Sequence, residues 1–594
     1  MLPALRRFAA GRENVTVLHN ERNRGFVKTV NRGLRRTRGH VVLLNTDVEL
    51  PQGWLERLMQ PIFQFETVAS VTPFSNCATI FSFPEMGDNA LYRNLSVHEL
   101  DGYFRAVAPR YTLVPTGVGF CMGMSRRALD AVGLLDEELF EKGYGEENDW
   151  CQRAIKAGFV NVHAENLFVY HKHGGSFLPE EKRRLIEEHT ALLTARHPNY
   201  PGDVAAYIER DPLKALRAQL RFRIRSTHSG EKTLLVFSHA LGGGAELYLD
   251  AQGPRWQAEG YSVLILRYVP GSDSYRLDCR FSDERFAVEL ADWDAVEALL
   301  HDCALDRIVV NELVTYPALF ARLSDIGRLA REKGARLLML IHDYLAVSPS
   351  INLVSPQDYL YAREGTGFHC DRFYEADGRA AEFGCPSVAQ WRERWERFLL
   401  ACDEVRCFSE SSRQLMAEVY PALHSLTVVP HRVAYMPRVH KERKTTATLN
   451  IGVIGAISEE KGLTILEQMA EIIHTEKLPI RIRVLGYTAR EPKRRGIVSC
   501  TGKFERESLP ELVEENEIDV ILIPSIWPET FSYTTAESMM MGLPVAVFDL
   551  GAPAERVREY ERGIVIPEIS AEAAIREISR YWQNQTSERN SAKE

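Results

Sequence analysis

Short runs of β-forming residues alternate with segments of helical apolar spacing along almost the whole chain of 594 residues. This strand–helix alternation predicts parallel sheets covered by helices on both faces. A chain of this length exceeds one ordinary hydrophobic core, so several domains are expected. The runs predicted as strands are VTVLHN (15–20), HVVLLN (40–45), TLLVFSH (233–239), YSVLILRY (261–268), RIVVNE (307–312), RLLMLIHD (336–343), LNIGVIGA (449–456), RIRVLGY (481–487), DVILIPS (519–525) and PVAVFDL (544–550).

Two stretches interrupt this alternation. Residues 210–232 are basic, have little to bury and end in Ser, Thr and Gly, which predicts a helix and a solvated connector; a peripheral contact with anionic lipid or a partner is the alternative. Residues 436–448 form a second, polar break. The predicted parts are a first domain (1–212), a basic helix and linker (213–232), and two further domains (233–435 and 448–590).

The composition argues against several classes of protein. The formal net charge is −9, whereas nucleic-acid binders usually have a basic excess, so nucleic acid is not an expected partner. The ten cysteines are scattered without a CxxC pair, which is typical of free thiols in a reducing compartment, and a cytoplasmic protein is expected. Cys370 and Cys385 lie near His369, but their spacing does not fit a compact zinc site.

Two acids follow one of the predicted strands closely. Asp47 and Glu49 come directly after the apolar run 40–45 and, on a continuing strand, would point to the same face. At the carboxyl end of a strand such acids lie in the usual ligand crevice of an α/β sheet. Carboxylate oxygens suit Mg²⁺ or Mn²⁺, and such an ion can hold a diphosphate. A solvated turn is the alternative interpretation.

Four ordered segments of the first domain resemble the inverting sugar transferases of glycosyltransferase family 2, which have the GT-A fold. By that resemblance Asp47 is the ligand of metal and nucleotide diphosphate, and His171 completes a Mn²⁺ or Mg²⁺ site. Glu147 falls on the family's catalytic base, although the family usually has Asp there, so Asp149 stays an alternative. The segments are NRGFVKTVNRGLRRTRGHVVLLNTDVELPQGWLERL (23–58), VTPFSNCATIFSFP (71–84), GVGFCMGMSRRALDAVGLLDEELFEKGYGEENDWCQRAIKAGF (117–159) and VYHKHGGSF (169–177).

The chemistry of an inverting transfer requires such parts. One base must take the proton of the acceptor hydroxyl, and the departing diphosphate needs charge stabilisation. An acid-rich first turn of a helix, stabilised by the helix dipole, is the structural alternative for Glu146, Glu147 and Asp149.

The resemblance also predicts an incomplete first domain. In family 2 a further strand–helix unit precedes the run that corresponds to residues 15–20, and it carries an acid that contacts the nucleotide base. This chain begins after that unit, so we expect a domain that lacks its N-terminal part. A sheet without a central parallel strand has unpaired edges, which lowers its stability.

The C-terminal two thirds of the chain carry a second group of motifs. Gly243 and Gly244 lie in a glycine-rich turn between a strand and a helix, where backbone can approach a phosphate closely. Glu529 and Glu537 are spaced as E-x7-E in PSIWPETFSYTTAESMMMGLPVAVFDLGAPAERV (524–557). Together with GVIGAISEEKGLTIL (452–466), HDYLAVSPSINL (342–353) and FSESSR (408–413), this segment resembles glycosyltransferase family 4, a retaining family of GT-B fold.

The family 4 resemblance implies a role for each motif. Lys461 neutralises the leaving diphosphate, Glu537 holds the ribose, Glu529 faces the donor sugar, and His342 contacts the sugar from the other domain. A cofactor is not expected, because a lysine and helix N-termini can take the diphosphate charge. Ala456 stands where the family often has Arg, so one cationic contact is missing.

The sequence thus predicts an α/β chain in which an incomplete GT-A domain precedes a GT-B pair of Rossmann-like domains. The expected function is that of a bifunctional, hexosyltransferase-type enzyme. It would move sugars from nucleotide-diphosphate donors to a glycan or lipid-linked saccharide, as in surface polysaccharide, O-antigen or capsule synthesis. The resemblance places such an enzyme at the inner membrane face. The alternative is that only the GT-B part is catalytic and the first domain is a docking or scaffold domain.

Overall fold

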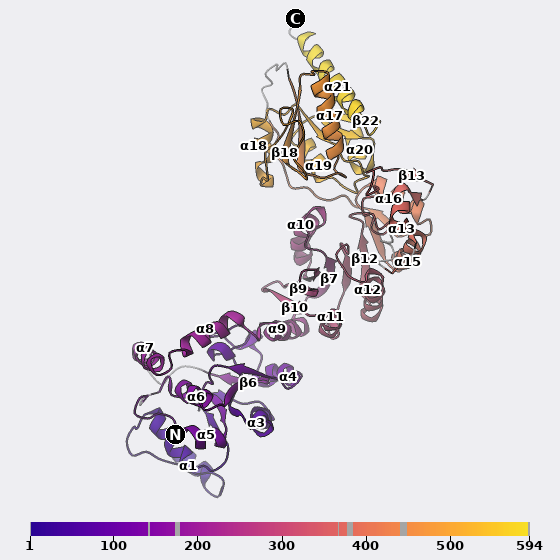
Figure 1. Cartoon of the computed structure of the whole chain (residues 1–594). Helices are drawn as coiled ribbons and strands as arrows, with labels where there is room; N and C mark the ends of the chain where they lie inside the picture. The colour runs from indigo at the N-terminus through magenta and orange to yellow at the C-terminus, as the bar shows by residue number, and fades with distance from the viewer. Residues whose placement is uncertain are drawn as a thin grey trace. The chain divides into compact units, whose positions relative to one another are not determined.

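The computed structural model describes residues 2–140, 143–172, 179–365, 367–376, 384–385, 387–439 and 448–591. The chain forms two compact units, which we call unit 1 (residues 1–229 and 301–303) and unit 2 (residues 230–300 and 304–594). In Figure 1 the colour of the ribbon runs from indigo in unit 1 to yellow at the end of unit 2. Among the described residues, no helix has the length and apolar character that crossing a membrane requires.

Unit 1 combines one sheet with helices. Its strands are β1 (Val41–Leu44), β2 (Val48–Glu49), β3 (Val68–Ser75), β4 (Tyr111–Val114), β5 (Cys121–Met124) and β6 (Val160–His171). Its helices are α1 (Leu2–Ala9), α2 (Phe26–Leu34), α3 (Trp54–Gln64), α4 (Val97–Arg105), α5 (Arg126–Val132), α6 (Glu146–Lys156), α7 (Pro179–Arg196), α8 (Tyr200–Arg210) and α9 (Lys214–His228), with short 3-10 turns at Thr79–Phe81 and Tyr92–Asn94.

The sheet of unit 1 has the order β1-β5-β3-β6-β2, and β4 also pairs with β6. Among its described pairs only β3 and β6 run parallel, so the expectation of a parallel sheet is wrong here. The strand predicted at residues 15–20 is also absent from this described stretch, which has no regular structure. A strand needs a hydrogen-bonded neighbour, and β1 forms the edge of the described sheet with β5 as its partner.

Helix α9 corrects a second expectation. The segment is helical as predicted, but Leu220 and Ile224 pack with Phe104 of α4 in one buried cluster of unit 1. Arg217 and Arg225 of the same helix are buried as well. The basic residues hid this apolar stripe, because their long side chains can lie along a buried surface. Residues 214–228 are therefore part of unit 1 and not a solvated connector.

The first half of unit 2 contains one eight-stranded sheet. Its strands are β7 (Lys232–Ser238), β8 (Tyr261–Val269), β9 (Ser274–Arg280), β10 (Arg285–Leu290), β11 (Arg307–Val310), β12 (Arg336–Leu340), β15 (Glu404–Cys407) and β16 (Leu426–Val428), with a separate pair β13 (Arg363–Glu364) and β14 (Gly367–Phe368). Its helices are α10 (Gly244–Ala258), α11 (Trp293–Leu300), α12 (Leu319–Lys333), α13 (His369–Ala376), α15 (Val388–Leu400) and α16 (Glu410–Val419). The order is β10-β9-β8-β7-β11-β12-β15-β16. Within it the neighbouring strands β8, β7, β11, β12, β15 and β16 run parallel to one another.

The second half of unit 2 contains a six-stranded parallel sheet of order β19-β18-β17-β20-β21-β22. Helices α17 and α21 lie side by side against it and bury one apolar cluster (Figure 1). The strands are β17 (Leu449–Ile457), β18 (Ile480–Thr488), β19 (Val498–Cys500), β20 (Val520–Ile523), β21 (Val545–Phe548) and β22 (Gly563–Ile566); the helices are α17 (Leu463–Thr475), α18 (Leu509–Glu515), α19 (Tyr533–Met540), α20 (Gly551–Arg558) and α21 (Ala571–Ser591), after a 3-10 turn at Arg506–Ser508.

The two halves of unit 2 contact each other through specific groups. Glu555 of α20 accepts hydrogen bonds from the backbone N–H groups of Glu410 and Ser411 at 3.2 and 2.8 Å. These donors lie in the first turn of α16, where a carboxylate interacts favourably with the helix dipole. Thr530 also donates a hydrogen bond to the carbonyl oxygen of His342 at 2.6 Å.

The predicted strands of unit 2 all appear within a few residues of their expected places. The predicted domain bounds stay predictions, and the polar break at 436–448 falls mostly on residues 440–447, which lie outside the described residues.

Candidate active sites

Asp47 and His171 meet at one end of the unit 1 sheet. Val48 pairs with His171 across strands β2 and β6, so the neighbouring Asp47 places Oδ1 3.6 Å from Nε2 of the histidine. The backbone N–H of Lys172 donates to the Asp47 carbonyl oxygen at 2.9 Å and fixes this turn. Part of the predicted motif 169–177 lies outside the described residues, from residue 173 onward.

The geometry of His171 fits a metal ligand. Its Nδ1 lies 3.3 Å from the carbonyl oxygen of Cys77, which can only accept, and the tautomer with the proton on Nδ1 has a lone pair on Nε2 for an ion. Two ligands of one Mg²⁺ ion, each about 2.1 Å from it, lie at most about 4.2 Å apart. The observed 3.6 Å therefore allows both residues to hold one ion. A group of three or more His, Cys, Asp or Glu ligands does not occur among the described residues, so a diphosphate or water would supply the others.

Two carboxyl groups open helix α6. Glu146 is buried and Glu147 half-buried, and one carboxyl oxygen of each has no hydrogen-bond partner among the described residues. Burial, and then the neighbouring Glu147, raise the pKa of Glu146 well above its usual value. A Cβ atom on Gly119 would lie 4.0 Å from Oε1 of Glu147, so the missing side chain leaves space beside this carboxylate.

Residues 119–120 connect the two parts of this site. The ring of Phe120 stacks on His171 with 5.2 Å between the ring centroids, and its carbonyl oxygen accepts from Asn45, just before Asp47. The same short segment of chain therefore borders both parts of the site: Gly119 lies beside Glu147, and Phe120 lies beside the Asp47–His171 pair.

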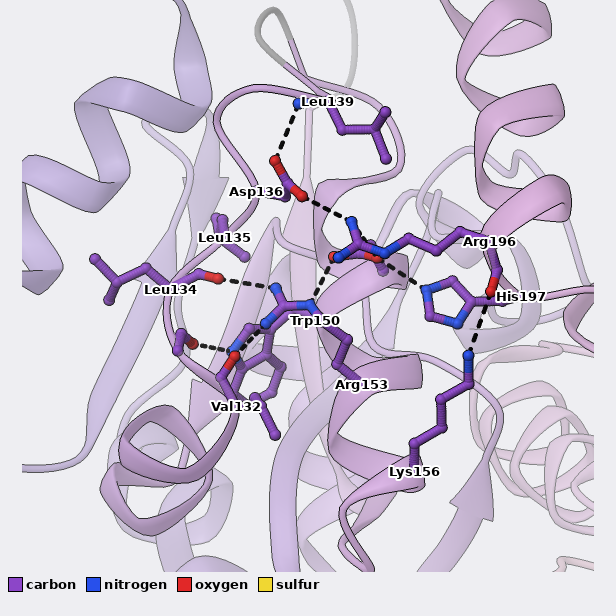
Figure 2. Close-up of polar contacts among 12 residues, drawn as sticks. Val132, Leu134, Leu135, Asp136, Leu139, Trp150, Arg153, Lys156, Arg196 and His197 are labelled. Atoms are coloured by element: carbon purple, nitrogen blue, oxygen red, sulfur yellow. Dashed lines mark hydrogen bonds and ion pairs between the residues drawn. The ribbon is translucent and has the colours of Figure 1, made fainter.

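Asp149 has a different environment from Glu147. It is fully buried and accepts from Nε2 of His197 and from Nε of Arg153, both at 2.8 Å, while Arg196 lies 3.3 Å away. Figure 2 shows Arg153, Arg196 and His197 converging in this network, together with Asp136. Both Asp149 oxygens are therefore occupied, which favours a structural role for Asp149 and leaves Glu147 as the better candidate base.

In unit 2, Lys461 and Glu529 form an ion pair. Nζ lies 2.6 Å from Oε1 of Glu529 and 5.5 Å from the ring centre of Trp527. Glu529 is almost fully buried, with 4% of its side chain exposed, whereas 38% of the Lys461 side chain remains exposed. The lysine amine is thus held in place by a buried acid and can still reach a ligand.

Gly551 packs closely against the backbone that leads into Glu529. A Cβ atom there would lie 2.6 Å from the carbonyl carbon of Pro528, so a side chain would displace the backbone before Glu529. The N–H of Ala552 donates to the carbonyl oxygen of Glu529 at 2.9 Å. The start of α20 therefore packs on the backbone that carries this acid.

Glu537 lies on α19 and pairs with Arg506. Burial raises the pKa of Glu537, and the guanidinium of Arg506 opposes that shift. Arg506 also lies over the ring of Tyr533, 5.1 Å from its centre. Both acids of the E-x7-E motif are thus buried and each is paired with a cation.

His342 follows β12 and belongs to the other half of unit 2. Its Nε2 lies 2.9 Å from Oδ1 of Asn311, whose amide nitrogen donates to Ser238 and Ala245, so Nε2 is the protonated nitrogen. Burial and then His431 lower the pKa of His342 well below its usual value, which keeps the ring neutral. Its Nδ1 is then an acceptor, suited to a sugar hydroxyl.

The glycine turn also faces the second half of unit 2. Gly243 has φ +82° and is the N-cap of α10, and a Cβ atom on Gly244, the first helical residue, would lie 3.6 Å from the ring of Tyr533. The first turn of α10 and the start of α19 therefore lie close together. Ala456 is exposed near the end of β17 and brings no charge.

Sequence reasoning missed several residues of this candidate site, chiefly Arg506 and His431. Arg506 lies in the polar stretch before α18, which has no recognisable pattern, so the sequence held no signal for it. Tyr533 stood inside the E-x7-E segment and could have been singled out. Cys370 and Cys385 are buried free thiols, and a zinc site is not found among the described residues.

Comparison with known proteins gives two matches to family models. Residues 2–133 match the model "Glycosyl transferase family 2", and residues 448–584 match "Glycosyl transferases group 1". No curated protein matches the chain.

Several solved structures are similar to the larger part of the chain. Sucrose-phosphate synthase from Thermosynechococcus elongatus is 15% identical over 59% of this chain and 90% of its own, with a TM-score of 0.40. HepE from Anabaena, in complex with UDP-glucose, is 16% identical over 59% and 90%, with a TM-score of 0.38. The pneumococcal O-GlcNAc transferase GtfA, in complex with UDP and GlcNAc, is 10% identical over 60% and 93%, with a TM-score of 0.37.

The two family models cover separate segments, one in each unit. Unit 1 therefore contains the segment that is similar to glycosyltransferase family 2, and unit 2 contains the segment that is similar to the group 1 glycosyltransferases.

Proposed function

We propose that the chain is a bifunctional glycosyltransferase with an inverting, metal-dependent site in unit 1 and a retaining site in unit 2. The observation that carries the proposal for unit 2 is the pairing of Glu529 with Lys461 and of Glu537 with Arg506, and the proposal for unit 1 rests on the 3.6 Å approach of Asp47 and His171. The paired groups of unit 2 lie beyond the carboxyl ends of parallel strands, the position where α/β sheets bind nucleotides. We also assign the retaining site of unit 2 to glycosyltransferase family 4.

In unit 1 we assign the base to Glu147. Its carboxylate takes the proton of the acceptor hydroxyl, and the acceptor oxygen then displaces the nucleotide diphosphate from the sugar with inversion. Asp47 and His171 would hold Mn²⁺ or Mg²⁺, which supplies positive charge for the leaving diphosphate. Asp149 fixes helix α6 and thereby the position of Glu147.

In unit 2 the transferred sugar would keep the anomeric configuration that it has in the donor. Lys461 offsets the charge that develops on the departing diphosphate, and the first turn of α10 adds backbone N–H groups of Gly243 and Gly244. Glu529 faces the donor sugar, Glu537 accepts from the ribose hydroxyls, and His342 accepts a hydroxyl of the sugar. These groups need no metal ion for their roles.

The substrates follow from the same resemblance. We propose nucleotide-diphosphate sugars as donors and a glycan or lipid-linked saccharide as acceptor, in the synthesis of a surface polysaccharide such as O-antigen or capsule. Two transferases in one chain suit stepwise assembly, because the product of one site can be the acceptor of the other. A peripheral position at the inner membrane face fits a lipid-linked acceptor.

Metal removal tests the site in unit 1. We expect EDTA, or Asp47→Ala, to abolish the transfer catalysed by unit 1, because this carboxylate would hold the ion that supplies positive charge for the leaving diphosphate. The measurement is sugar transfer by the full chain that carries Lys461→Ala, which silences unit 2. Asp130→Ala removes a largely exposed carboxylate of unit 1 and serves as the control. Full transfer in EDTA would exclude Asp47 as a metal ligand.

Nucleotide affinity tests Glu537. Glu537→Ala should weaken binding of the nucleoside diphosphate by unit 2 and raise KM more than it lowers kcat, because a ribose contact is present in ground and transition states alike. Calorimetric titration in EDTA, which silences unit 1, measures the affinity. Unchanged affinity would remove the ribose assignment.

The same variants decide the alternative role of unit 1. If Asp47→Ala and Glu147→Gln leave total transfer unchanged while Lys461→Ala abolishes it, unit 1 is a docking domain and only unit 2 is catalytic.

A further inference from the structure

A row of side chains joins the two halves of unit 2 and is not part of any motif that predicted the site. It begins at the Glu537–Arg506 ion pair, continues through the Arg506 guanidinium over the ring of Tyr533, and reaches His431, whose Nδ1 lies 2.9 Å from the Tyr533 hydroxyl. The ring of His431 then contacts that of His342 edge to face, with 5.2 Å between centroids.

His431 is the residue of this row that lies at the junction of the halves. It follows β16 of the first half, yet it stacks on Phe531 of the second half, with 4.4 Å between centroids and 19° between planes. The ring is 7% exposed. Burial, together with the cation of Arg556, lowers its pKa to about 3, so the ring is neutral at physiological pH.

The hydroxyl of Tyr533 is a hydrogen-bond partner of the His431 ring. Nε2 of His431 lacks a hydrogen-bond partner among the described residues, so the Tyr533 hydroxyl makes the single hydrogen bond found there for the imidazole. The ring also stacks on Phe531 and meets Phe408 edge to face with 3.9 Å between centroids, but these contacts offer no polar partner. The hydrogen bond from the second half therefore contributes the polar restraint on how His431 presents its edge to His342.

The two ends of the row are residues with proposed contacts to the donor. Glu537 accepts from the ribose in one half, and His342 accepts from the sugar in the other. A direct link between these halves also runs through Thr530, which donates to the His342 carbonyl oxygen and so holds the backbone. The imidazole of His342 is held separately, by Asn311 at Nε2 and by the ring of His431.

We propose that Tyr533 and His431 are positioning residues that couple nucleotide binding at Glu537 to the orientation of His342. This inference rests on the proposed function of unit 2. Nucleotide bound by Glu537 fixes Arg506, the guanidinium fixes the ring of Tyr533, and the hydroxyl of Tyr533 orients His431 against His342.

The test measures hydrogen exchange of the full chain with and without nucleotide in EDTA. The probe is whichever of UDP, GDP, ADP or dTDP binds, and the readout is the peptide that covers residues 341–353. We expect nucleotide to slow exchange of this peptide in the unmodified protein. Tyr533→Phe keeps the ring and removes only the hydroxyl, so it should lose most of that protection and lower kcat by about 2- to 10-fold, the effect of one net hydrogen bond.

Two further variants separate coupling from stability. Tyr560→Phe removes another hydroxyl of the same half, one that donates to the carbonyl oxygen of Leu543 at 3.0 Å, and should leave the nucleotide effect at 341–353 intact. His431→Phe should reproduce Tyr533→Phe, and the double variant should be no worse than either, because both remove the same link.

The outcomes are distinct. Equal nucleotide protection in the unmodified protein and in Tyr533→Phe, or additive losses in the double variant, would overturn the coupling while the proposed function stands. Failure of all four nucleotides to bind would overturn both.

Discussion

Replacement of Lys461 by alanine should lower the turnover of unit 2 by about 10²-fold or more, the size typical for loss of a group that stabilises developing charge. The amine can reach a ligand because it stays partly exposed, and Glu529 holds it in place. Its attraction to the diphosphate grows as the sugar bond breaks, so kcat falls and not merely the affinity for the donor. The measurement is donor hydrolysis and transfer by the full chain in EDTA.

A stability measurement and two further variants serve as controls for this prediction. Lys461→Ala leaves Glu529 buried without a cation, which can destabilise unit 2, so thermal unfolding is followed in parallel. Lys461→Arg keeps the charge and should retain part of the activity. Lys493→Ala removes a lysine of the same half whose side chain is 77% exposed, and should have little effect. Wild-type turnover in Lys461→Ala would refute the role of this residue.

Glu147→Gln should reduce transfer by unit 1 by about 10²- to 10⁴-fold, because a general base contributes that much and the amide cannot accept the proton. Donor binding should persist, since the side chain keeps its shape. Transfer is measured in the full chain with Lys461→Ala, with saturating donor and Mn²⁺. Glu138→Gln alters an exposed acid of the same unit and serves as the control.

Asp149 gives the contrasting result. Asp149→Ala should destabilise unit 1 by about 3–5 kcal/mol, because it leaves the buried partners of an ion pair uncompensated. Arg153 and His197 are those partners. A stable Asp149→Ala variant without transfer activity would instead move the base to Asp149, the residue that sequence reasoning could not separate from Glu147.

The strands of unit 2 were predictable because each is a short buried run between helices, and a parallel strand needs apolar residues on both faces. Unit 1 was harder to predict. Residues 111–114 and 121–124 pair antiparallel to other strands, and this direction depends on contacts with residues distant in sequence. The run at 15–20 has the composition of a strand, but strand formation depends on a neighbour that a local pattern cannot supply.

The candidate sites show the same limit. Motifs located Asp47, Glu147, Lys461 and the two acids of E-x7-E, because chemistry restricts these residue types and spacings. The partners of these residues were not predictable. Arg506 pairs with Glu537 from a turn about thirty residues earlier along the chain, in a segment where other polar residues would look equally ordinary.

The burial of α9 decides where the first unit of this chain can be separated from the second. A cut at residue 212, the predicted end of the first domain, would remove Leu220 and Ile224 from an aromatic cluster that includes Phe74 and Phe104. Each such side chain contributes about 1.5–3 kcal/mol when buried, so the shortened fragment would lose much of a domain's net stability. A fragment that ends after Ser229 keeps this helix. For anyone who wishes to produce unit 1 or unit 2 alone, the place to divide the chain lies after α9 and not before it.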